Sequence, residues 1–501
     1  MLKSKEHSMA VPNAFDERSI PNLPGVERGD IDLNKTEPKT AVKTGRVQWI
    51  DFAKGIAILA TILGHTADVG KTGSDVRALI FSFHMPLFFI LSILTYRCSN
   101  SLEEYKMKHG VSDIDSWEAE GYEFKIQHPC LVHTAADFDR VKAKVQQQAE
   151  PWYSGWKKLL ESPYADPNRA HNPQKEIYRH SAGGNYNVAA FDAGQAYQLA
   201  LRWKISGDTQ CADKAVQILN DWARTCTDGV NQTQYQTDSH RLLAAGFIGY
   251  QFANPAEIMR DYEGWKKEDF EFFKEWITKT FYPICYEFLG DHFNSAPEDG
   301  WMSWDLPAML TILSIGVLCD DADKINFALR YFYEGEGMGC IENSVVAMHE
   351  DPAGRVQGKH LAQSQEMGRD QGHATLNVPL HAYFCQTAYN IGIDLFSYKD
   401  NIVLDLCEYT AKYNVNPNET VDLPYTPYYS GKEGWHNVVA SDGRGRQRPG
   451  WELIYNHYVK IKGVNAPYSQ EFAETMRPEG GGERGTAEAC DLGFGTLMYT
   501  R

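Results

Sequence analysis

The sequence lacks the features of several common classes of protein. Acidic residues outnumber basic ones by 66 to 49, and the formal net charge is −17. This balance argues against a nucleic-acid partner, because surfaces that bind nucleic acids are basic. The ten cysteines are scattered from Cys98 to Cys490 without a Cys-x-x-Cys pair, which argues against a structural zinc site or a dense disulfide framework. We therefore expect mostly buried thiols and no cofactor.

The N-terminal region has neither a recognisable signal peptide nor a complete membrane domain. Residues 1–45 are polar and contain no continuous apolar stretch, so we expect a disordered leader without a cleavable signal. Two apolar segments follow at residues 52–63 and 79–96, and the second approaches the ~20 residues that span a bilayer. Polar residues interrupt both segments, and lipid tolerates such residues poorly unless other helices shield them.

The two apolar segments carry a family resemblance of their own. The sequences WIDFAKGIAI, from residue 49, and FSFHMPLFF, from residue 81, resemble the start of the acyltransferase-3 family of membrane O-acyltransferases. That family has many membrane spans, whereas the pattern here stops after two. We therefore interpret residues 46–98 as a truncated fragment and possible membrane tether. Residues 99–123 are charged and without apolar periodicity, and we expect a linker there.

Beyond residue 124 the apolar residues recur at helical spacing. Asp or Gly stands at many of the breaks between these segments, which predicts pairs of helices joined by short turns. The expected fold is mostly α: an (α/α) toroid, or incomplete barrel of helical hairpins, over residues 124–501. After Val415 the chain is rich in Gly, Pro, Tyr and Arg, which predicts a loop-rich C-terminal segment. The expected helices cover residues 191–203, 212–223, 242–260, 270–289, 304–318, 323–333, 376–391 and 401–413.

The densest group of chemically useful residues is the segment QSQEMGRDQGH, which begins at residue 363. If this segment is helical, Glu366, Arg369 and His373 share one face of the helix. An ion-paired exposed face with a bystander histidine fits the same spacing. A metal site made of Glu366, Asp370 and His373 is a further alternative, but no additional ligand cluster accompanies it.

A second group combines aromatic residues with arginines. Pro-Tyr pairs around Tyr428 are followed by Trp435-His436 and by three arginines from Arg444 to Arg448. Aromatic rings suit the faces of sugars, and guanidinium groups pair with carboxylates in bidentate fashion. Ordinary loop packing, with the prolines fixing turns, explains the same residues equally well.

Together these segments resemble the alginate-lyase superfamily. Residues 365–373 are similar to its Q-E-S-G-R-D-Q-G/A-H signature, and other landmarks follow in the same order over roughly residues 124–500. Those landmarks are residues 249–258, 315–321, 408–414 and 455–458. The chain looks most like polysaccharide lyase family 38, whose members act on alginate or glucuronan. One departure is Trp301-Met302-Ser303-Trp304, where many relatives have His-Gly-Asn-Trp, so an asparagine that could neutralise the substrate carboxylate is missing.

The resemblance implies a carbon–oxygen lyase that cleaves a uronate-containing polysaccharide by β-elimination. Such an enzyme needs a group that neutralises the C5 carboxylate, a base and an acid. We assign Tyr428 as base, acid or both, and His373 as its partner base or as a neutraliser. Arg369 would stabilise the carboxylate or a tyrosinate, lowering the pKa of Tyr428, and Glu366 would orient or neutralise. Subsite candidates, each equally compatible with a structural role, are Gln371, Asn185, Tyr186, His240, Trp304 and Arg446.

Two other functions remain open at this stage. A glycoside hydrolase on the same kind of toroid would use two carboxylates, such as Glu366 with Asp299 or Asp305. A non-catalytic protein could instead clamp a polyuronate with its arginines and tyrosines. In each case the expected partner is an anionic polysaccharide, alginate or glucuronan, and the expected location is the periplasm or cell envelope. The sequence leaves open which uronate is preferred and whether the polymer is cleaved internally or from its ends.

Overall fold

The computed structural model describes residues 122–431, 433–481 and 491–501. The predicted leader (1–45), the acyltransferase-like fragment (46–98) and nearly all of the linker (99–123) lie outside the described residues. Eight cysteines fall within these residues; none of the eight forms a disulfide, and all but Cys319 are buried, as expected. Among the same residues, no helix is both long and apolar enough to cross a bilayer.

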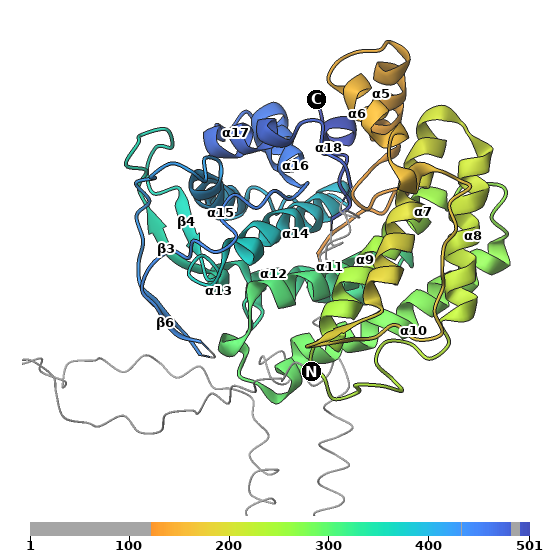
Figure 1. Cartoon of the computed structure of the whole chain (residues 1–501), viewed down its shortest axis with the longest axis horizontal. Coiled ribbons are helices and arrows are strands. Elements are labelled where there is room, and N and C mark those ends of the chain that lie inside the picture. Colours follow the sequence, from red (N-terminus) through yellow and green to blue (C-terminus); the bar gives the residue numbers. More distant parts are fainter. Residues whose placement is uncertain (1–121, 432, 482–490) are drawn as a thin grey trace, which may run out of the picture. The chain divides into compact units, whose positions relative to one another are not determined.

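The described part of the chain is mostly helical, which confirms the predicted fold class. Four helix pairs, α7–α8, α9–α10, α11–α12 and α14–α15, provide the hairpins of the toroid (Figure 1). The α-helices are α5 (Ala135–Gln146), α6 (Trp152–Leu160), α7 (Tyr186–Ser206), α8 (Thr209–Thr225), α9 (Arg241–Met259), α10 (Lys267–Asp291), α11 (Met302–Leu318), α12 (Ala322–Glu334), α13 (Ile341–Ser344), α14 (Gln371–Asn390), α15 (Tyr398–Asn414), α16 (Trp451–Tyr455), α17 (Pro467–Met476) and α18 (Gly495–Met498).

Three antiparallel two-stranded ribbons complete the described fold. They pair β1 with β2, β3 with β4 and β5 with β6. In the third ribbon Tyr428 lies opposite His436 and Tyr429 opposite Trp435. The strands are β1 (Arg179–His180), β2 (Gly183–Gly184), β3 (Val345–His349), β4 (Leu361–Ser364), β5 (Tyr428–Ser430) and β6 (Gly434–His436). Short 3-10 turns occur at Pro163–Ala165, His292–Asn294 and Pro297–Asp299, and a π-helical turn at Asn456–Ile461.

The turn between α7 and α8 shows how local chemistry ends one helix and starts the next. Gly207 adopts φ 80°, a left-handed conformation, and its N–H donates to Trp203 O at the end of α7. Asp208 then caps α8 by accepting a hydrogen bond from Gln210 N at 3.1 Å. Glycine tolerates this conformation and aspartate is a favoured N-cap, so the break expected between residues 203 and 212 is confirmed.

Helices α9 and α11 are the inner pair of the fold. Every residue of α9 from Leu242 to Met259 is buried, and α11 is similarly enclosed; a helix that is apolar on all sides belongs in a core. Their backbones approach closely, because a Cβ on Gly249 would lie only 2.4 Å from Thr311 Cγ2. Thr311 Oγ1 also donates to Gly246 O at 2.7 Å. This close packing fixes the middle of α9 against the middle of α11.

The C-terminal segment is more helical than expected. The predicted loops are present, together with the short strands β5 and β6, but helices α16 and α17 follow them. In α17, Tyr468, Phe472 and Ala473 are buried, an i, i+4, i+5 pattern too short to stand out among prolines and glycines. Arg140 Nη2 on α5 donates to Met498 O on α18 at 2.7 Å. The end of the chain thus packs against the first described helices.

Candidate active site

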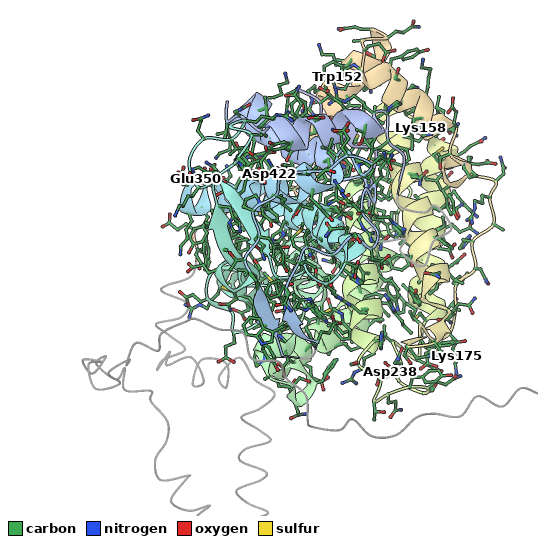
Figure 2. All side chains as sticks on the ribbon, turned by 60° about the vertical axis from the view of Figure 1, so that its left-hand side comes forward. Trp152, Lys158, Lys175, Asp238, Glu350 and Asp422 are labelled. Carbon is green, nitrogen blue, oxygen red and sulfur yellow. The ribbon has the colours of Figure 1, made fainter. Side chains whose placement is uncertain are left out.

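The predicted site residues gather at the N-terminal ends of inner helices. His240 precedes α9, Trp304 lies in the first turn of α11, and His373 lies in the first turn of α14. The rings of His240 and Trp304 are 5.6 Å apart, and Ser303 Oγ donates to the Glu366 carboxylate at 2.7 Å. These contacts join three helix ends that are far apart in the sequence. Figure 2 shows Asp238, two residues before His240, at the lower end of this helical region.

The segment from Glu366 to Asp370 is a turn and not part of a helix. β4 ends at Ser364 and α14 begins at Gln371, so the condition under which Glu366, Arg369 and His373 would share one helical face is not met. Asp370 has an extended backbone, and its carboxylate accepts from His373 N at 2.8 Å as the N-cap of α14. An extended N-cap residue interrupts the helix on its N-terminal side. Only His373 of the three is therefore helical.

Glu366 is completely buried and holds Arg369 in place. Its carboxylate accepts from Ser303 Oγ at 2.7 Å, from Arg369 Nη1 at 2.9 Å, and from Asn377 Nδ2. The Arg369 guanidinium lies 4.4 Å from the centre of the Trp301 ring, and 17% of its side chain is exposed. In this structure the Glu366 carboxylate therefore fixes the position of the Arg369 guanidinium.

Asp370 lies between Arg369 and His373. His373 Nδ1 is 2.6 Å from Asp370 Oδ2, and Arg369 Nε is 3.8 Å from the same oxygen. Burial would raise the pKa of Asp370, but the hydrogen bonds and charges of His373 and Arg369 outweigh it and lower that pKa. When Nδ1 donates to this carboxylate, Nε2 of the 39% exposed His373 side chain is left as a proton acceptor.

Tyr428 packs beneath the same turn with its side chain largely buried. Its hydroxyl donates to Gln365 O and accepts from Gly368 N at 3.2 Å, and the His436 ring stacks on it at 4.9 Å. Burial raises the pKa of Tyr428 well above its usual value, and nearby Glu366 reinforces this. The expectation that Arg369 lowers this pKa is therefore wrong, because loss of hydration dominates. The phenol stays protonated at neutral pH.

Two of the subsite candidates are used by the fold itself. Gln371 is buried; its amide donates to Met367 O and Ala440 O and accepts from Asn414 Nδ2. Asn185 likewise accepts from Tyr178 N and donates to Glu176 O, both at 2.8 Å. These placements favour the structural alternative for both residues.

The remaining subsite candidates are more accessible. The Arg179 guanidinium lies 4.4 Å from the centre of the Tyr186 ring. Arg446 is exposed in the loop after β6. His240 Nδ1 lies 2.8 Å from Asp238 Oδ1. Burial would raise the pKa of Asp238, but hydrogen bonds from His240 lower it. Roles for these residues in substrate binding stay predictions.

The structure shows contacts of the predicted site residues that the sequence motifs did not indicate. Asp238 and Asp370 each orient a histidine, and Asp-x-His and Asp-x-x-His spacings at loop–helix junctions could have indicated both. Ser303 supports Glu366 from the segment that departs from the family pattern. His436 Nδ1 pairs with Gly368 O at 2.9 Å, a contact between segments distant in sequence that no local pattern predicts.

Two of the alternative sites are disfavoured by the geometry. Asp305 is fully buried and accepts from Tyr331 Oη at 3.0 Å and Gly339 N at 2.9 Å, so it cannot pair with Glu366 as hydrolase acid and base. The carboxylates of Glu366 and Asp370 are committed to different partners, which disfavours a shared metal. Within the described ranges, the only His/Cys/Asp/Glu group close enough to hold a metal is His128, Cys130 and Glu257.

The chain is similar to known alginate lyases. Similar solved structures include an alginate lyase from Bacteroides ovatus, at 13% identity and a TM-score of 0.47, which covers 75% of this chain and 100% of that one. Alginate lyase A1-III from Sphingomonas species A1 is 14% identical with a TM-score of 0.49, covering 75% of this chain and 99% of that one. No curated protein matches the sequence. A family model for alginate lyase matches residues 139–420. The chain therefore belongs to the alginate lyase family and is a polysaccharide lyase.

Proposed function

We propose that this protein cleaves alginate, as polymannuronate or polyguluronate, by β-elimination at the cluster of Arg369, Asp370 and His373. The observation that carries the proposal is the placement of Asp370 against both the guanidinium and the imidazole. This arrangement provides a cation for a uronate carboxylate beside a base for the adjacent proton. Glucuronan is the alternative substrate, in keeping with the resemblance to polysaccharide lyase family 38.

Arg369 is the group that neutralises the C5 carboxylate in this mechanism. Guanidinium groups bind carboxylates through two parallel hydrogen bonds, and a neutralised carboxylate makes the proton on C5 more acidic. The Trp301 ring and the Glu366 carboxylate both contact this guanidinium and hold it in place. This role replaces the asparagine that is absent from the segment Trp301 to Trp304.

His373 and Tyr428 divide the two proton transfers. His373 Nε2 takes the C5 proton, the electrons of that bond form the C4=C5 double bond, and the C4–O4 bond breaks. The leaving O4 takes the phenolic proton of Tyr428. The raised pKa of Tyr428 suits the acid role, since the phenol is protonated before the reaction. Asp370 stabilises the imidazolium that forms, as a carboxylate does in other histidine-based catalysts.

The test is ultraviolet absorbance during incubation of the purified full chain with polymannuronate, polyguluronate and glucuronan in separate reactions. Elimination leaves an unsaturated uronate that absorbs, so a rise with one polymer names the substrate. New reducing ends without absorbance would instead indicate a hydrolase. If neither absorbance nor reducing ends increase, but the protein is retained on immobilised polymer, the result would indicate a non-catalytic polyuronate-binding protein.

The proposal includes a location in the periplasm or cell envelope, with residues 46–98 as a membrane tether. Extracellular polysaccharides reach that location, and the two apolar segments supply a hydrophobic anchor. Flotation of the full chain with phospholipid vesicles tests the tether. Recovery of all the protein away from the vesicles would contradict it.

A further inference from the structure

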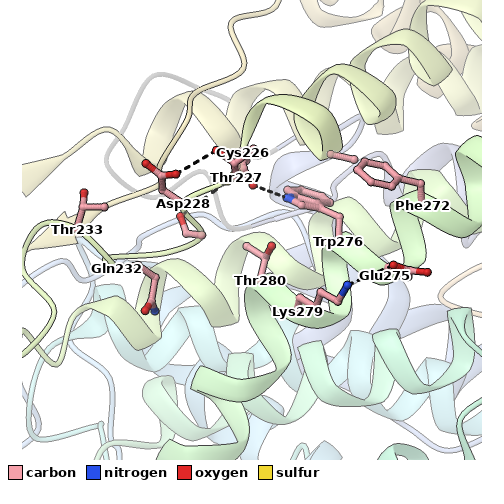
Figure 3. A pocket seen from close by; sticks show the side chains of 12 residues that line it. Cys226, Thr227, Asp228, Gln232, Thr233, Phe272, Glu275, Trp276, Lys279 and Thr280 are labelled. Atoms are coloured by element: carbon pink, nitrogen blue, oxygen red, sulfur yellow. Dashed lines mark hydrogen bonds and ion pairs between the residues drawn. The ribbon is translucent and has the colours of Figure 1, made fainter.

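A cavity of about 540 Å³ lies between α10 and the loop that follows α8, and Ala223 near the end of α8 also lines it (Figure 3). This volume falls within the range of pockets that bind small ligands, roughly 300–1,000 Å³. None of the candidate active-site residues lines the cavity. It is therefore a separate site on the same helical scaffold.

The apolar part of the cavity comes from two aromatic residues of α10. Phe272 and Trp276 are four residues apart, so they lie on one face of the helix (Figure 3). Phe272 is 47% exposed, which is unusual for a phenylalanine. Trp276 is buried, and its indole N–H donates to Cys226 O at 3.1 Å, which fixes the ring. An exposed ring beside a fixed one suits the apolar C–H face of a pyranose.

The polar part comes from the loop after α8 and from a neighbouring turn of α10. Gln232 uses its Nε2 in a 3.1 Å bond to Val230 O, leaving its amide oxygen as an acceptor. Thr233 is held by Glu176, which accepts from its backbone N at 2.7 Å and also from its hydroxyl. Thr280 extends the polar lining on α10 (Figure 3). Amide and hydroxyl groups around an aromatic surface are the partners that sugar hydroxyls use.

The charges at the cavity are already compensated. Asp228 pairs with Lys175 at 2.9 Å, and Glu275 pairs with Lys279 at 3.2 Å along α10. Each acid thus has its own cation, and these four charges cancel. A neutral ligand fits this balance better than an anionic one.

We propose that this cavity is an accessory binding site for a neutral saccharide of about two sugar units, a size that suits the volume stated above. The pyranose ring packs on Phe272, and its hydroxyls bond to Gln232 and to the polar groups nearby. This cavity would bind a neutral ligand, whereas the proposed cleavage site binds a polyuronate. Binding at the cavity therefore does not depend on the proposed reaction.

Isothermal titration calorimetry of the full chain with cellobiose, mannobiose and maltose tests the site, with dimannuronate as the charged counterpart. We expect at least one neutral disaccharide to bind at millimolar concentration. Phe272→Ala and Gln232→Ala should each weaken that binding about tenfold, equivalent to about 1.4 kcal/mol. Tyr389→Ala, at an exposed tyrosine on α14 outside the cavity, serves as the matched control and should leave it unchanged.

Three results would overturn the proposal. One is the absence of heat with all three neutral disaccharides at concentrations that saturate weak sites. Another is binding that neither Phe272→Ala nor Gln232→Ala alters. The third is Phe272-dependent binding of dimannuronate as strong as that of the neutral sugars, which would make the cavity part of the polyuronate path. Lyase activity is measured in parallel on the same preparations, so failure of either proposal is seen separately.

Discussion

At the scale of single residues, Asp370 has two roles, one as the N-cap of a helix and one as a partner of the His373 ring. Its carboxylate starts α14 by accepting from His373 N, and it orients the imidazole of the same residue. An asparagine preserves the first task, because asparagine is as good an N-cap as aspartate. It removes the second, because the oxygen that faces His373 Nδ1 becomes an NH2 group, which can neither accept the Nδ1 proton nor stabilise an imidazolium by charge. The two roles can therefore be separated by one substitution.

We expect Asp370→Asn to lower kcat for polyuronate cleavage by about 10²-fold or more, within the range that acid–base positioning contributes. The melting temperature should change little, since the cap is retained. Asp422→Asn, at an exposed aspartate, is the control and should retain wild-type kinetics. Unchanged kcat in Asp370→Asn would remove the Asp370–His373 pair from the mechanism.

Tyr428→Phe tests whether the buried hydroxyl donates a proton or only clamps the turn. The ring keeps its stacking on His436, while the bonds to Gln365 O and Gly368 N are lost. We expect activity to fall about 10²-fold or more while near-ultraviolet circular dichroism retains the native signal. Near-full activity would show that the hydroxyl is structural.

At the scale of secondary-structure elements, the close approach of α9 and α11 decides where the site residues lie. Both helices are apolar on nearly all sides, so their position depends on mutual packing and not on an amphipathic face. Gly249 and Thr311 meet at the contact. His240 and Trp304 stand at the starts of these helices, so a shift along this contact would separate them.

We expect Gly249→Ala to lower the free energy of unfolding by about 1–3 kcal/mol, the usual cost of overpacking a core. The added methyl would meet Thr311 at distances below van der Waals contact. Gly290→Ala in α10 is the matched control, since a Cβ there meets nothing within 4 Å, and alanine favours a helix by roughly 0.5–1 kcal/mol. Urea denaturation of both variants measures the difference, and equal stabilities would refute the packing argument.

At the scale of the whole described molecule, the last residues close the fold against earlier segments. Glu479 lies just after α17 and accepts from Thr496 N at 2.8 Å at the start of α18. Glu479 is buried near Glu452. Burial is the larger cause and the negative charge of Glu452 the smaller one, and together they raise the pKa of Glu479 to about 7. The packing of the C-terminal residues therefore includes a carboxyl group whose protonated form is favoured in the folded state.

A raised carboxyl pKa makes folding stability fall as pH rises. Between pH 4.5 and about 7 the folded state binds more protons at Glu479 than the unfolded state, so the free energy of unfolding decreases across that window. We expect Glu479→Gln to remove this part of the pH dependence. The variant should match the wild type near pH 5 and exceed it at pH 8, by at most about 3 kcal/mol.

Thermal unfolding at several pH values measures this difference, with exposed Glu474→Gln as the control. Glutamine keeps one acceptor for Thr496 N and can donate to the Thr496 hydroxyl, so both contacts of Glu479 remain possible. A variant that is destabilised equally at all pH values would contradict the assigned protonation.

The sequence by itself determined the helical hairpins and the segment that carries the chemistry. Turn residues such as Gly207 and Asp208 act through their own backbone and side-chain preferences, so the breaks between helices could be predicted locally. The segment from residue 365 to 373 likewise could be recognised from residue identities, as could the expectation of buried thiols. These features depend on neighbours in the chain, which a sequence displays directly.

Only the tertiary structure decided how that chemistry is arranged. The pKa of Tyr428 follows from burial beneath a turn some sixty residues earlier, which no spacing reveals. The extended N-cap Asp370 placed Glu366 and Arg369 outside the helix, so these residues and His373 do not share one helical face. Glu366 is a buried support because Ser303, on α11, donates to its carboxylate. Hydration, charge and hydrogen-bond partners depend on which distant segments meet, and that is fixed by packing of the whole chain.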